Sequence, residues 1–180
     1  LLDSTSREYS DSQQLVHRQA ADLISRLAQG ESSGEHYDYS TSGGKTQIVT
    51  DLVGQTKELH EKYGYNWQQA AEASLFGSLV AKLGFSKGAG GDGASGGIDG
   101  SFGVSGSISA RKYDEQGLGE QYGASQRKES SINTEAVVKG LNSIQFGTNQ
   151  SAEKSLAHQL SDSYDKTLQL RESVAIHKQN

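Results

Sequence analysis

The hydrophobic positions between residues 5 and 29 recur at alternating steps of four and three, which is the spacing of one face of an α-helix. The stripe is as narrow as the seam of a coiled coil, and Gln13 is its single polar member. Gly30 follows the stripe, and a left-handed glycine commonly ends a helix. We therefore predict a helix over 5–29 that is ended by Gly30. Its seam consists of Tyr9, Gln13, Val16, Ala20, Leu23 and Leu27.

Two further helices are predicted before a glycine-rich stretch. Apolar positions in residues 46–63 keep a helical spacing, and Gly64 is placed to end that helix. Asn66 is a suitable N-terminal cap for the next helix, which runs from Trp67 to Leu83. Because apolar residues cover most of its circumference, this third helix should be buried in the core.

Residues 86–127 have a different pattern, in which glycine and serine dominate the first half, as in a flexible linker. Residues 101–110 alternate between apolar and serine positions, which predicts a short β-strand. A strand needs a partner, and the candidates are residues 36–39 and the stretch around Tyr122. If it has none, its apolar side chains are free to bind another protein. The predicted partner-binding residues are Phe102, Val104 and Ile108.

Helical spacing returns weakly between Thr134 and Ile144, and then over a long polar helix from Ser151 to Lys178. The seam of the last helix is impure, so this helix needs a partner, and the first helix is the natural one in an antiparallel pair. The sequence thus predicts a mainly α fold, an elongated helical bundle or coiled-coil-like hairpin with a small glycine-rich β element. Its predicted parts are a three-helix segment (1–85), a linker with the β element (86–127) and a helical tail (128–180).

Composition narrows the class of protein. The sequence contains no Pro, Cys or Met, and a chain that begins with Leu1 is expected to be an excised piece of a larger protein. Its low content of large apolar residues predicts helices that complete their cores with a partner or a second copy. A net charge of −5 with interspersed signs disfavours nucleic-acid binding. No apolar run reaches the length of a membrane span, so the piece itself should be soluble.

No pattern of residues predicts catalysis, a metal site or a cofactor. The chain has no cysteine nucleophile and no serine in a strained elbow. Residues 42–46 lack the first glycine of a phosphate-binding loop, and residues 90–93 lack the aspartate of a calcium-binding repeat. The five histidines are scattered, and each is expected to be solvated or half-buried. Residues 36–39 form a polar-aromatic cluster, interpreted either as an exposed loop tip or as a contact patch.

Three segments follow one another in a recognisable order: a short apolar helix (73–85), an alternating glycine- and serine-rich stretch (100–113) and a polar helical tail (156–175). This order resembles the C-terminal, periplasmic region of the TraG family of conjugative type IV secretion systems. The resemblance covers roughly residues 70–176 and includes no catalytic motif. It implies a plasmid-encoded parent protein in the bacterial inner membrane, with a soluble tail in the periplasm. It also implies roles in mating-pair stabilisation and entry exclusion, through an inner-membrane exclusion protein of the recipient and other secretion-system components.

We therefore expect a non-enzymatic interaction segment that acts outside the cytoplasm by protein–protein contact. Two alternatives stay open. A structural coiled-coil or spacer segment of a secretion or phage assembly would self-associate and have no specific partner. A translocation segment of a bacteriocin-like toxin would insert the helix that begins at Trp67 into lipid, and the fluorescence of Trp67 would then shift to the blue with vesicles.

Overall fold

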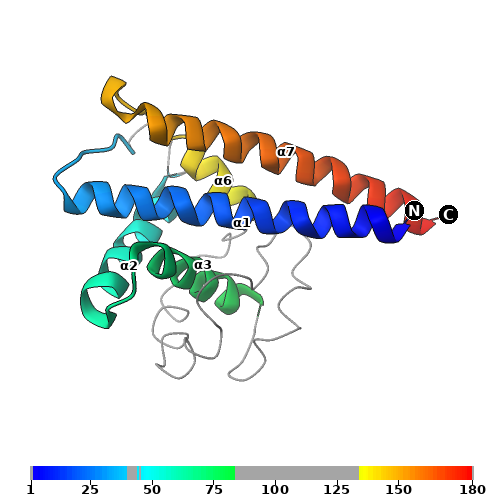
Figure 1. Ribbon diagram of the computed structural model, residues 1–180, viewed down its shortest axis with the longest axis horizontal. Helices are drawn as coiled ribbons and strands as arrows, with labels where there is room; N and C mark the ends of the chain where they lie inside the picture. Colours follow the sequence, from blue (N-terminus) through cyan, green and yellow to red (C-terminus); the bar gives the residue numbers. More distant parts are fainter. Residues whose placement is uncertain (1, 40–43, 45, 84–133, 180) are drawn as a thin grey trace.

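A computed structural model describes residues 2–39, 44, 46–83 and 134–179 of the chain (Figure 1). The mainly α prediction is confirmed for these residues. Their elements are α1 (Leu2–Ser32), α2 (Gln47–Tyr63), α3 (Trp67–Leu83), α6 (Thr134–Asn142), the 3₁₀ turn η2 (Thr148–Gln150) and α7 (Ser151–Gln179). The described residues include no strand, and their one β contact is an isolated bridge between Asp38 and Gln145. The predicted linker (86–127) and its β element (101–110) lie outside the described residues.

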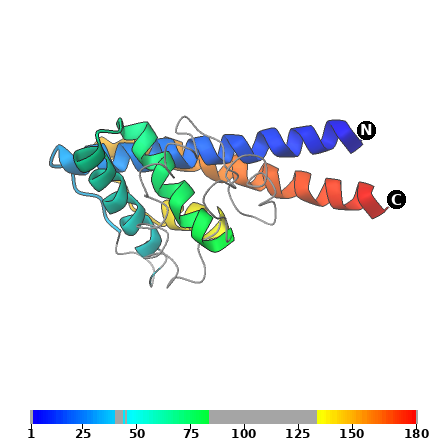
Figure 2. The ribbon, with the colours of Figure 1, turned by 90° about the horizontal axis from the view of Figure 1, so that it is seen from below.

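The two longest helices, α1 and α7, form the antiparallel hairpin that the sequence predicts. Both chain ends lie at the same end of this hairpin (Figure 1). With 31 residues, α1 is about 46 Å long. α2 and α3 pack against α1, and α6 packs against α2 and α7 (Figures 1 and 2). α1 is therefore covered on two sides along part of its length.

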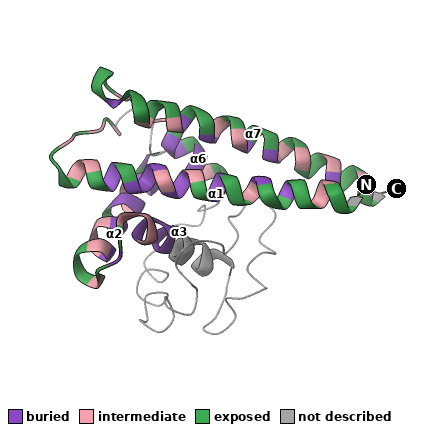
Figure 3. Ribbon diagram, in the orientation of Figure 1, coloured by how far each residue is buried: buried purple, intermediate pink, exposed green. Residues whose placement is uncertain are grey.

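One hydrophobic core joins α1, α2, α3, α6 and α7. The core therefore contains residues from before and from after the glycine-rich stretch of the sequence. Figure 3 shows the buried residues concentrated where the hairpin meets the three shorter helices. The predicted seam of α1 is part of this core from Val16 onward, whereas Gln13 is half-buried. The largest fully buried side chains are Leu23, Ile24, Leu27, Leu52, Leu59, Tyr65, Leu75 and Leu141.

The predicted end of the first helix at Gly30 is wrong, because α1 continues through this residue to Ser32. The left-handed residue is Gly34, with φ of 99°. The N–H of Gly34 donates to the carbonyl of Glu31 at 3.1 Å, and that of Glu35 donates to the carbonyl of Gly30 at 2.8 Å. This pair of bonds is a Schellman motif, which satisfies two terminal carbonyls of the helix.

Gly30 has a different structural role, which is to make room for Tyr37. A Cβ atom at position 30 would overlap the Tyr37 hydroxyl and lie 3.0 Å from the Cζ atom of the ring. The ring cannot easily retreat, because it packs edge-on against Phe146 with centroids 6.3 Å apart and lies 6.4 Å from the ring of Tyr39. The glycine therefore lets the loop after α1 fold back onto the helix.

The predicted signals between α2 and α3 are confirmed. Gly64 ends α2 in the left-handed conformation, with φ of 73°. Asn66 Oδ1 accepts the backbone N–H of Gln69 at 2.8 Å, and Gln69 Oε1 accepts that of Asn66 at 3.4 Å, which is a capping box. His60 Nδ1 donates to the carbonyl of Tyr65 at 2.7 Å, and its ring stacks on Trp67 with centroids 3.8 Å apart. The turn thus holds the two helices at a defined angle.

Replacing Gly30 with alanine should lower the free energy of unfolding by about 1–2 kcal/mol, because overpacking against Tyr37 outweighs the gain in helix propensity. Thermal or urea unfolding monitored by circular dichroism measures the change. Gly54→Ala is the matched control: this exposed glycine in α2 has open space around its Cα, so alanine should stabilise by about 1 kcal/mol. Equal stabilisation by both changes would contradict the packing role of Gly30. Adding Tyr37→Phe to Gly30→Ala should recover part of the loss.

Candidate interaction surfaces

The seam between α1 and α7 changes character along its length. Near α2, α3 and α6 it is apolar: Leu23 and Leu160 are both fully buried. Toward the chain ends the seam contains fewer buried apolar side chains. We call this region, α1 residues 2–15 with α7 residues 164–179, the hairpin end. Its buried side chains are Tyr9, Ser12, Tyr164, Thr167 and Val174. The hairpin end projects beyond the three shorter helices (Figure 2).

A buried polar contact lies within the hairpin end. Ser12 Oγ and Thr167 Oγ1 are 2.5 Å apart across the seam, and the two residues are only 7% exposed. Thr167 Oγ1 also lies 2.8 Å from the carbonyl of Ser163, to which it donates its single proton. Ser12 must then donate to Thr167. We call this pair the polar layer; a buried polar pair of this kind specifies the register of two helices at some cost in stability.

Arg171 occupies the seam position between Thr167 and Val174, and its side chain is exposed rather than buried. Two large apolar side chains in this part of the hairpin also face solvent: Leu15 is 36% exposed and Ile176 58%. Apolar contact between the helices is therefore limited here. The hairpin end depends on Tyr9, Tyr164, Val174 and the polar layer, which makes it the weakest-packed pairing of the two helices.

The cluster at residues 36–39 is neither a freely exposed tip nor an open contact patch, because its two tyrosines turn inward. Tyr37 and Tyr39 are half-buried and pack against the core. The Tyr39 hydroxyl donates to Glu31 Oε2 at 2.5 Å, and Lys57 Nζ lies 2.8 Å from Glu31 Oε1. Glu31 thus joins the loop to both α1 and α2. His36 and Asp38 remain exposed.

The same loop is joined to the start of α7 by Gln150, a buried polar residue. Gln150 Nε2 donates to the carbonyl of His36 at 2.9 Å, and Gln150 Oε1 accepts the N–H of Gly147 at 3.0 Å. Because both ends of this side chain are hydrogen-bonded, its burial costs little. The loop therefore holds α1 and α7 together at the end of the hairpin opposite the chain ends.

Burial is the main cause of the raised pKa values of the two loop tyrosines. It raises the pKa of Tyr37 to about 12, with further contributions from Glu153, Glu35 and Glu31. Burial and the hydrogen bond to Glu31 raise the pKa of Tyr39 well above its ordinary value. Both hydroxyls are therefore neutral at physiological pH and serve as structural groups.

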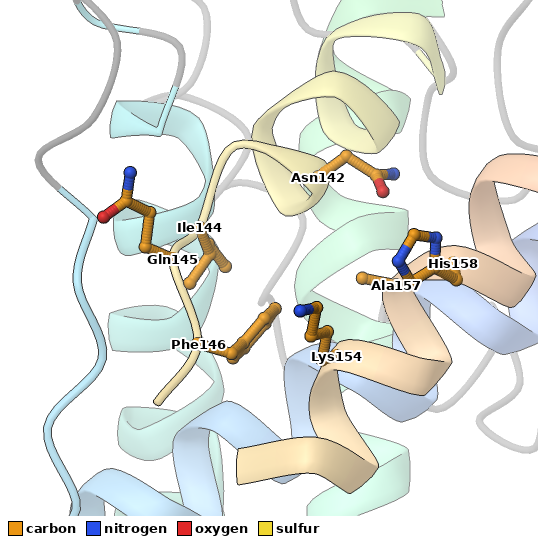
Figure 4. Close-up of a pocket in the computed structure, with 7 residues that line it drawn as sticks. All are labelled: Asn142, Ile144, Gln145, Phe146, Lys154, Ala157 and His158. Carbon is orange, nitrogen blue, oxygen red and sulfur yellow. The ribbon is translucent and has the colours of Figure 1, made fainter. Parts of the chain in front are cut away.

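An open cleft of about 370 Å³ lies between the segment after α6 and the first turns of α7. Figure 4 shows Ile144 and Phe146 on one side of it and α7 on the other. The side chain of Gln145 points away from α7 (Figure 4). Ile144 is buried and Phe146 half-buried, so the floor is apolar, while the rim is exposed and polar. The polar side chains of the rim belong to Asn142, Lys154 and His158.

The predicted partner-binding residues Phe102, Val104 and Ile108 lie outside the described residues. One expectation about the histidines is wrong, because His17 is only 2% exposed, where α1 is covered on two sides. The narrow-seam pattern counts Gln13 but not Ser12, so it finds the seam and misses the polar layer. No sequence pattern marks the cleft, whose walls come from different elements.

The described residues contain no helix that is both long enough and apolar enough to cross a bilayer. Comparison of the chain with known protein families, with curated proteins and with solved structures finds no match. Function is therefore argued from the surfaces described above.

The polar layer can be tested with a double-mutant cycle. Thr167→Val should cost about 1–3 kcal/mol of unfolding free energy, because it leaves the buried Ser12 hydroxyl without an acceptor. Ser12→Ala should cost less, since Thr167 keeps its bond to Ser163. The double variant should be close to the wild type, because both polar groups are gone. Strictly additive effects in chemical denaturation would show that the two hydroxyls do not interact.

Alkaline pH should destabilise the fold through the loop tyrosines. Tyr37 keeps its proton in the folded chain up to a pKa of about 12, whereas an unfolded tyrosine loses it near 10. The contribution of Tyr37 is thus fully present below pH 10 and is lost as the pH rises from about 10 toward 12, and the raised pKa of Tyr39 adds a loss in the same direction. Unfolding measured over this range should show a shallower loss for Tyr37→Phe/Tyr39→Phe. Equal slopes for the wild type and the double variant would refute the assignment.

Proposed function

We propose that the chain is a non-enzymatic interaction segment that binds a helical segment of a partner protein at the hairpin end. The observation that carries this proposal is the weak pairing of α1 and α7 there. A seam with few apolar contacts and an internal polar layer loses little when one helix exchanges its neighbour. An incoming amphipathic helix could supply the apolar contacts that the hairpin end lacks.

The order of its segments supports a more specific proposal, a role like that of the periplasmic region of the TraG family. In that role the parent protein is anchored in the bacterial inner membrane of a conjugating donor. Its partners are the exclusion protein in the recipient's inner membrane and other components of the secretion system. The segment then contributes to mating-pair stabilisation and entry exclusion. The hairpin is suited to such a role because one end is held firmly by the loop after α1 and the other is weakly paired.

The toxin-like alternative requires the helix that begins at Trp67 to leave its present contacts. Trp67 stacks on His60 and packs against the core. Insertion into lipid would break this stacking and the capping box at Asn66. The observed packing therefore favours protein binding over membrane insertion.

The proposal is tested by conjugation from donors whose full-length protein carries Ile176→Lys, a change to an exposed side chain of the hairpin end. Transfer into recipients with the exclusion protein should rise about tenfold, which corresponds to about 1.4 kcal/mol of lost contact. Transfer into recipients that lack the exclusion protein should stay unchanged if this surface serves exclusion alone. It should fall if the surface also stabilises mating pairs.

Gln29→Lys is the matched control, because it adds the same charge to an exposed position of α1 that lies far from the hairpin end. It should leave both kinds of transfer unchanged. A third donor lacking residues 86–127 separates the hairpin from the glycine-rich stretch. If Ile176→Lys behaves as the wild type in both recipients, the hairpin end is not the contact surface. If that deletion alone abolishes exclusion, the recognition element is the glycine-rich stretch.

A further inference from the structure

The cleft beside the start of α7 has a charge opposite to that of the chain as a whole. The chain carries a net charge of −5, yet no carboxylate lines the cleft. Lys154 and His158 lie one helical turn apart on the face of α7 that borders it, and both are exposed. Glu153, the acid adjacent in sequence, acts instead on the Tyr37 hydroxyl, whose pKa it helps to raise.

Lys154 belongs to none of the ion pairs of the described helices, which join Arg26, Lys57, Lys62 and Lys139 to acids within 4.0 Å. It shares this with Lys166 and Arg171 of the same helix, and differs from them in lining the cleft. Asn142 adds a polar group to the rim. One hydrogen of its Nδ2 is donated to the carbonyl of Val138 at 3.0 Å, so the second is left for a ligand.

We propose that this cleft binds a carboxylate side chain that is next to a large apolar side chain in an exposed segment of a partner protein. Lys154 pairs with the carboxylate, Asn142 and His158 contribute hydrogen bonds, and the apolar side chain lies on Phe146 and Ile144. A cleft of about 370 Å³ is near the lower limit of ligand pockets, so it accommodates a pair of side chains rather than a cofactor. The proposal rests on the proposed function only in naming a protein as the source.

The cations of the cleft match a carboxylate better than a phosphate. Lys154 is the single lysine or arginine among the lining residues of the cleft. Phosphate sites usually combine several cationic or backbone N–H donors, and arginine is preferred for its paired geometry. The cleft has no arginine among its lining residues. One carboxylate is therefore the anion whose charge this site balances.

The test is an NMR titration of the isotope-labelled 180-residue chain. The ligand is N-acetyl-glutamyl-phenylalanine amide, and its matched control is the glutaminyl peptide, which lacks only the charge. The glutamyl peptide should shift the methyl signal of Ala157 and the side-chain amide of Asn142, with a Kd in the millimolar range. The glutaminyl peptide should bind at least about tenfold more weakly, equivalent to about 1.4 kcal/mol.

Lys154→Gln should weaken binding of the glutamyl peptide by about tenfold. Lys166→Gln, which removes an exposed lysine of α7 outside the cleft, should leave it unchanged. The proposal is overturned if neither peptide shifts these signals, if both bind equally, or if inorganic phosphate binds more tightly than the glutamyl peptide. These outcomes are independent of the conjugation test, because Ile176 is not part of the cleft.

Discussion

The burial of α1 between two groups of helices is the constraint on which the rest of the fold depends. One side of α1 packs against α7, and α2 and α3 cover another. This arrangement requires apolar or small residues around much of the helix between Val16 and Ala28, and the sequence supplies them in Ala20, Ala21, Leu23, Ile24 and Leu27. Where α2 and α3 no longer cover the hairpin, the sequence of α1 becomes polar on the uncovered faces. The contrast between the well-packed part of the hairpin beside α2 and α3 and the weakly paired hairpin end follows from this one change.

Local signals predict the helices well, because hydrogen-bonded caps and periodic apolar positions act over a few residues. The seam of α1, the left-handed Gly64 and the Asn66 cap were all predictable in this way. Even the antiparallel pairing follows from two helices with incomplete seams. These features require no knowledge of residues distant in the sequence.

The features that the sequence failed to predict share a different cause: each depends on contacts with residues distant in the sequence. Gly30 and Gly34 carry the same local signal, and what distinguishes them is the ring of Tyr37, which needs the space above Gly30. The burial of His17 depends likewise on the helices that cover α1. The cleft arises only when the segment after α6 is laid beside α7, and the Ser12–Thr167 contact joins residues 155 positions apart. Periodicity carries no information about such contacts.

The antiparallel hairpin also determines how far apart the two proposed binding surfaces lie. Both chain ends lie at the hairpin end (Figure 1), whereas the cleft lies beside the first turns of α7. From Ala157 to the end of α7 at Gln179 is about 33 Å along the helix. A ligand held in the cleft and a helix bound near Gln179 would lie most of that length apart along α7 and would not compete for space. A single small chain could then act as a rod that holds two partners apart.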